Sequence, residues 1–99
     1  MNVLMARSKI KAESVAEVEA AIEKVFSEIK QAQPTGVRYA SSRLADGVTF
    51  VVLLKLEGEG DNPLAAVPAF VEFQEDLKKW MAEPPTVEQM TVIGSYRLF

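Results

Sequence analysis

Four large side chains recur at steps of three or four residues near the end of the chain: Phe70, Phe73, Leu77 and Trp80. This spacing places them on one face of an α-helix. An indole N–H is a directed hydrogen-bond donor, and one edge of a large Trp ring often borders a cleft. The stripe therefore indicates either the core-facing side of a helix or one wall of a pocket for a flat, apolar ligand.

Two tyrosines and two arginines offer further polar groups to such a ligand. Tyr39, Tyr96, Arg7 and Arg97 all fall in segments with the alternating pattern of strands. Paired guanidinium groups can bind a carboxylate or enolate oxygen, and the alternative is that both arginines form ion pairs at the rim of an interface. The candidate ligand-pocket residues are Trp80, Tyr96, Tyr39, Phe73, Phe70, Arg7 and Arg97.

The composition excludes several kinds of site. The chain of 99 residues contains no His and no Cys, so it lacks the commonest general base, a thiol nucleophile and the usual zinc ligands. We therefore expect no metal and no cofactor. The net charge of −3 argues against nucleic acid as a partner. No apolar run approaches the ~18 residues of a membrane span, and the first residues do not resemble a signal peptide, so we expect a cytoplasmic protein.

Alternation of residue types predicts four strands. They cover residues 2–11, 37–44, 48–56 and 87–99, and the last is expected to be long. Asp46-Gly47 separates the second strand from the third and is a pair typical of a hairpin turn.

Two helices are predicted between these strands. Ser14 and Glu17 fit a capping box at the start of the first helix, which ends before Pro34. A short turn over residues 63–66, capped by Asp61 or Asn62, precedes the second helix. This helix begins near Val67 or Pro68 and ends before Pro84-Pro85.

The order βαββαβ predicts one α+β domain over residues 1–99, because the chain is too short for a second hydrophobic core. This ferredoxin-like plan has an antiparallel four-stranded sheet with two helices on one face. Val51 and Leu53 nevertheless give the opposite face apolar side chains. Burying each is worth roughly 1.5–3 kcal/mol, and a large apolar patch usually marks an interface. We therefore expect a homodimer packed sheet against sheet, with the long last strand available to pair beyond its own sheet.

The element order, the length and the apolar third strand resemble the dimeric α/β-barrel superfamily. Within it, the helix AFVEFQEDLKKWM and the closing segment AEPPTVEQMTVIGSYRLF resemble the antibiotic-biosynthesis monooxygenase-like domains. The resemblance implies a dimeric α/β barrel that oxidises a polycyclic aromatic substrate without metal or flavin, in a hydrophobic pocket between helices and sheet. The haem-degrading branch of that family has a helix His and a first-strand Asn. This chain has no His and only Asn2 at the outer end of the strand, so we expect no haem degradation.

Two functional hypotheses follow. The first is a cofactor-independent, monooxygenase-like protein that acts on or binds a small aromatic or polycyclic molecule. The alternative is a non-catalytic dimeric module of the same fold that binds a small molecule or has a structural role. A cavity between helices and sheet, beside Trp80 and Tyr96, would favour the first hypothesis, and a filled core there would favour the second.

Overall fold

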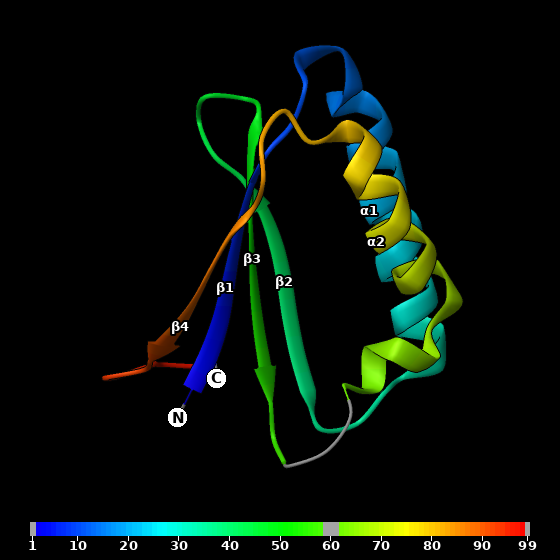
Figure 1. Ribbon diagram of the computed structural model, residues 1–99. Helices are drawn as coiled ribbons and strands as arrows, with labels where there is room; N and C mark the ends of the chain where they lie inside the picture. The colour runs from blue at the N-terminus through cyan, green and yellow to red at the C-terminus, as the bar shows by residue number, and fades with distance from the viewer. Residues whose placement is uncertain (1, 59–61, 99) are drawn as a thin grey trace.

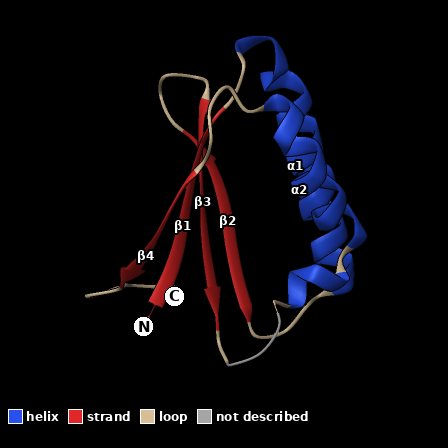
Figure 2. Cartoon of the chain, viewed as in Figure 1, coloured by secondary structure: helices blue, strands red, loops and turns tan. Residues whose placement is uncertain are grey.

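The computed structural model describes residues 2–58 and 62–98 and has two layers, a sheet and a pair of helices (Figures 1 and 2). The elements, in chain order, are β1 (Asn2–Lys9), η1 (Ala12–Ser14), α1 (Val15–Ala32), β2 (Val37–Arg43), β3 (Thr49–Leu56), η2 (Pro63–Ala66), α2 (Pro68–Trp80) and β4 (Thr86–Thr91). The βαββαβ order predicted from the sequence is confirmed. Within the described residues, neither helix combines the length and the apolar character that crossing a bilayer requires.

The sheet is antiparallel throughout, with the strand order β2-β3-β1-β4. Leu54 of β3 lies opposite Leu4 on one side and opposite Tyr39 on the other, and Ala6 lies opposite Val87 of β4. Side chains alternate along a strand, so these positions share one face. Both helices cover this face, as Figure 1 shows. The other face is called the outer face below.

The buried core lies toward the end of β1. Ile10, Phe50 and the helix residues Val18, Val25 and Phe73 form one cluster in which each side chain is at most 6% exposed. Ile10 also forms an isolated bridge with Met81, directly after α2. β1 therefore ends at Lys9, and the predicted extension to Lys11 is reduced to this one bridge.

The β2–β3 hairpin is held by the side chain of Asp46. Its carboxylate accepts hydrogen bonds from the backbone N–H groups of Val48 (3.0 Å) and Thr49 (2.9 Å) and from the Thr49 hydroxyl (2.6 Å). Gly47 follows with φ +80°, a conformation that costs glycine least. The predicted hairpin is thereby confirmed.

The start of α2 also agrees with the sequence. Asn62 Oδ1 accepts a hydrogen bond from the Leu64 N–H at 2.9 Å and caps η2. Asp61, the other predicted cap, lies outside the described residues. Pro68 occupies the first position of α2, where its missing N–H costs nothing.

The predicted capping box at the start of α1 does not form. Ser14 is the N-cap residue, but its side chain makes no capping hydrogen bond. The carboxylate of Glu17 instead accepts a hydrogen bond from the Trp80 indole N–H at 3.0 Å. The Glu17 carboxylate is therefore engaged in a tertiary contact with Trp80 instead of the local capping box.

The last strand is shorter than predicted. β4 ends at Thr91, which lies opposite Asn2, the first residue of β1. Residues 92–98 alternate in type, but they form no strand and pair with no other strand among the described residues. Ile93 is 94% exposed and Tyr96 is 81% exposed. Phe99 lies outside the described residues.

Candidate functional site

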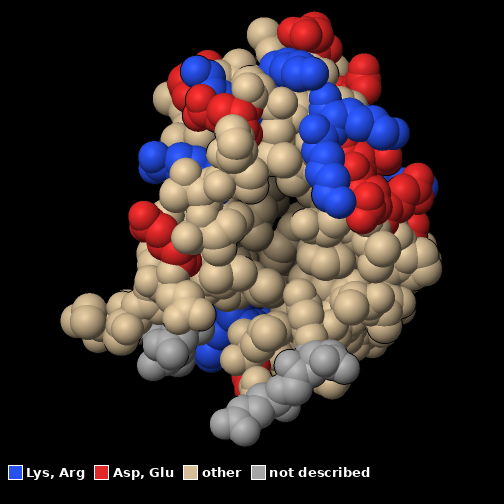
Figure 3. Space-filling view, in the orientation of Figure 1, with Lys and Arg blue, Asp and Glu red and all other residues tan. Residues whose placement is uncertain are grey.

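A cavity of about 490 Å³ lies between α2 and the sheet. Figure 3 shows the corresponding hollow near the centre of the molecule. Its volume falls within the roughly 300–1,000 Å³ of sites that bind small molecules. The lining residues are Leu4, Ala6, Ser8, Tyr39, Val52, Leu54, Asn62, Phe70, Phe73, Gln74, Leu77, Lys78, Met81, Pro85 and Val87.

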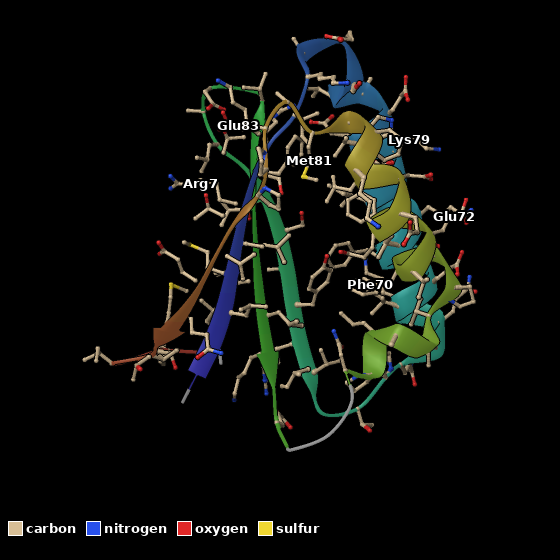
Figure 4. All side chains as sticks on the ribbon, viewed as in Figure 1. Arg7, Phe70, Glu72, Lys79, Met81 and Glu83 are labelled. Atoms are coloured by element: carbon tan, nitrogen blue, oxygen red, sulfur yellow. The ribbon has the colours of Figure 1, made fainter. Side chains whose placement is uncertain are left out.

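The walls of the cavity follow from the two periodicities of the chain. Leu4 and Ala6 of β1, and their partners Leu54 and Val52 of β3, form the floor on the helix-facing side. α2 contributes an apolar roof, and Phe70 points from this helix toward the sheet (Figure 4). The methyl side chain of Ala6 fills little of the space above the middle of the sheet. The next cross-strand pair on this face joins Ser8 of β1 to Phe50 of β3, and Phe50 belongs to the buried core.

The opening of the cavity has both polar and apolar residues. Gln74, Lys78 and Pro85 line the cavity and are exposed, and Val87 is 56% exposed. Lys78 is the charged residue of this lining, and its ammonium group lies 3.2 Å from the Glu75 carboxylate. None of the described lining residues is Asp or Glu, so the cavity wall offers a ligand no carboxylate base.

Tyr39 brings a phenol hydroxyl into this apolar space. Its ring stacks on Phe26 of α1 at a centroid distance of 5.2 Å and meets Phe70 of α2 edge-on at 5.9 Å. Burial raises the pKa of Tyr39 to about 12, because ionisation would place a charge in surroundings with little water. At neutral pH the Tyr39 side chain is therefore a neutral hydrogen-bond donor.

Three of the predicted site residues line the cavity together: Tyr39, Phe70 and Phe73. Trp80 lies about two turns beyond Phe73 along α2 and is not part of the lining. Its ring centroid is 6.4 Å from that of Phe73, and its N–H is bonded to Glu17.

The other predicted residues lie apart from the cavity. Tyr96 follows β4 rather than lying on a strand, and the Arg97 guanidinium lies 5.1 Å from the centroid of its ring. Arg7 is on the outer face, where Figure 4 shows it pointing away from the helices. It lines a separate polar pocket of about 230 Å³ with Asp46 and Glu83. Arg7 lies opposite Thr86 at the start of β4 and Arg97 lies beyond its end, so the two guanidinium groups do not converge.

Sequence reasoning missed most of the floor and the opening. The alternation of β1 puts Leu4, Ala6 and Ser8 on one face, but this pattern is the same for a filled core and for a cavity. The helical spacing puts Lys78 on the solvent-facing side of α2, where residues at the edge of an opening are also found. Among the described residues, no group of three or more metal-ligating side chains comes together.

No protein-family model matches the chain, and no curated protein matches it in sequence. Solved structures match its fold over nearly its whole length. A candidate antibiotic biosynthesis monooxygenase from Nitrosomonas europaea is 17% identical, with a TM-score of 0.74, over 95% of this chain and 100% of that one. Another from Caulobacter crescentus is 20% identical, with a TM-score of 0.73, over 94% of this chain and 90% of that one.

A variant of SnoaB, a cofactor-independent oxygenase from Streptomyces nogalater, is 15% identical, with a TM-score of 0.68. The match covers 97% of this chain and 96% of that one. At these identities the likeness establishes the fold. The chain has the ferredoxin-like fold of the antibiotic biosynthesis monooxygenase-like proteins, as its sequence predicted.

Proposed function

We propose that the cavity between α2 and the sheet binds a small aromatic molecule and that the protein oxidises it with dioxygen, without a cofactor. The observation that supports this proposal most is the cavity itself, about 490 Å³ in volume and lined mainly by aliphatic and aromatic side chains. A chain of this length would normally fill such a space with its own core. The fold is also shared with a cofactor-independent oxygenase.

The chemistry must use electrons from the substrate. A methylene group flanked by aromatic rings can react with dioxygen to give a carbonyl and water, and the substrate then supplies all four electrons. The substrate must first lose a proton, and none of the described lining residues is a carboxylate that could take it. An electron-rich phenolic ring that ionises by itself, with its proton passing to water at the opening, satisfies this requirement. The protein would bind the ring, orient it and keep bulk water from its centre.

The proposal is tested with dithranol, a three-ring phenolic compound with such a methylene group. Binding is measured by equilibrium dialysis under argon, and oxidation by quinone absorbance and oxygen uptake against the rate without protein. Ala6→Leu places a larger side chain at the middle of the floor and should reduce both binding and rate at least tenfold. Val71→Leu, on the exposed side of α2, is the matched control and should change neither.

The alternative function is a binding module without catalysis, and it is consistent with the lack of a carboxylate among the described lining residues. The two measurements separate these functions. Binding that Ala6→Leu removes, with no rate above background, would support the binding module. No binding by the folded wild-type protein would contradict both functions.

We also propose that two copies pack through their outer faces. Met5, Val51 and Leu53 are only half-buried there, and Leu98 is 58% exposed beside Leu53 and Ala40. Arg7 and Glu88 lie on the same face of neighbouring strands, and neither takes part in an ion pair within the described residues. A two-fold arrangement can bring Arg7 of one copy near Glu88 of the other while it buries the apolar residues.

A further inference from the structure

We infer that Tyr39 determines which ligands the cavity accepts, by donating a hydrogen bond to an uncharged oxygen such as a carbonyl. The inference rests on the proposed binding function and assigns a positioning and specificity role to one side chain. It does not require that the protein be a catalyst.

The phenol is held in place from two sides. Phe26 stacks on its ring with an interplanar angle of 15°, and Phe70 meets it edge-on at 83°. These two contacts come from different helices, and the tyrosine itself lies on β2. Because the ring is fixed by three separate elements, its hydroxyl is positioned before a ligand arrives.

The surroundings of Tyr39 contain little that competes with a ligand oxygen. Its partner in the sheet is Leu54, which lies opposite Leu4, and both leucines line the cavity. The Ser8 hydroxyl lies four residues beyond Leu4 along β1, about 13 Å away at the usual rise of a strand. The two hydroxyls therefore lie toward opposite ends of the cavity. The amide groups of Asn62 and Gln74 also line it, and the Asn62 oxygen already accepts a hydrogen bond from the Leu64 N–H.

The hydroxyl is available for binding. Among the described residues, the Tyr39 hydroxyl makes no hydrogen bond to another side chain or to the backbone. Within residues 2–58 and 62–98, no fully buried side-chain polar atom lacks a hydrogen-bond partner. The Tyr39 oxygen is therefore not fully buried, and the residue lines the cavity. A hydrocarbon placed there would displace the water that bonds to the hydroxyl and would offer no acceptor in its place. A carbonyl oxygen would accept the hydrogen bond that the water had accepted.

The test compares tetralin with 1-tetralone, two ligands of nearly the same shape that differ by one carbonyl oxygen. Dissociation constants are measured by equilibrium dialysis for the wild type, Tyr39→Phe and Tyr96→Phe. Tyr39→Phe keeps the ring and removes the hydroxyl, so the preference for tetralone over tetralin should fall about five- to tenfold. Tyr96→Phe removes the hydroxyl of an exposed ring and should leave the preference unchanged.

A pH series adds a second measurement. The wild-type preference should stay constant from pH 7 to pH 10, because the hydroxyl keeps its proton over that range. An unchanged preference in Tyr39→Phe, with both ligands still bound, would overturn the inference and leave the binding function standing. Failure of the folded wild type to bind either ligand would overturn both.

Discussion

Burial of Tyr39 links the stability of the protein to alkaline pH. The pKa of this side chain is raised to about 12 in the folded state, whereas an unfolded chain ionises near 10. Below pH 10 both states keep the proton and the linkage contributes nothing. Between pH 10 and pH 12 the unfolded state loses its proton more readily, so the free energy of unfolding falls as pH rises.

Tyr39→Phe removes this linkage and tests it. Urea unfolding at pH 8 and at pH 11 gives the free energy of unfolding for both proteins. The wild type should lose about 1 kcal/mol more than the variant between the two pH values. Lysines also titrate in this range but do so equally in both proteins, so the difference isolates Tyr39. Parallel losses would mean that the Tyr39 hydroxyl keeps enough water to ionise normally in the folded protein.

At the scale of the elements, Trp80 ties the end of α2 to the start of α1. Its ring packs against Phe73, and its N–H donates to Glu17. Trp80→Ala should lower the free energy of unfolding by about 2–4 kcal/mol, less than for a fully buried Trp, as measured by urea unfolding. Because Trp80 is outside the cavity lining, tetralone should bind the folded variant with an affinity within about twofold of the wild type.

Two milder variants separate the contributions of ring packing and of the hydrogen bond to the stabilising effect of Trp80. Trp80→Phe keeps most of the packing and loses the hydrogen bond, and Glu17→Gln keeps an oxygen that can accept it. Both should cost less than about 1.5 kcal/mol. A large loss of tetralone affinity in Trp80→Ala, with little loss of stability, would instead make Trp80 a wall of the binding site.

The elements that were predictable from the sequence are those whose signals are local. Asp46-Gly47 forms the hairpin turn, Asn62 caps η2, and Pro68 is the first residue of α2. Each was predictable because it acts on backbone groups within a few residues. The two predictions that were wrong, the capping box and the length of the last strand, depend on parts of the chain that are distant in sequence. Glu17 bonds to Trp80, 63 residues away, and β4 ends at Thr91, opposite Asn2 at the start of β1.

The cavity was only partly predictable for the same reason. Helical spacing placed Phe70 and Phe73 on the inner stripe of α2, and both line it. The same stripe included Trp80, because a period of 3.6 residues defines a direction and not a depth. Whether side chains above Ala6 meet or leave a space depends on how far α2 lies from the sheet, which no local pattern specifies.

At the scale of the molecule, the outer face determines the expected assembly. β3 carries Val51 and Leu53 there, while the charged residues Arg38 and Lys55 lie on the same face toward one end of their strands. A monomer would leave this surface in water, whereas a second copy would remove it from water at roughly 25 cal/mol per Å² of apolar area. The helices cover the opposite face, so pairing through the outer face leaves the opening between α2 and β4 free.

Light scattering after size exclusion tests this assembly directly. The wild type at micromolar concentration should give about twice the chain mass of 10.9 kDa. Val51→Glu should shift the population to monomer or aggregate, because an unpaired carboxylate buried at an interface costs several kcal/mol. Val71→Glu makes the same change at an exposed position of α2 and should stay dimeric. Since Val51 lies on the face opposite the cavity, a folded Val51→Glu monomer should still bind tetralone. A monomeric wild type would show that the apolar residues of the outer face and of residues 92–98 are stable in contact with solvent, and would contradict the proposed dimer.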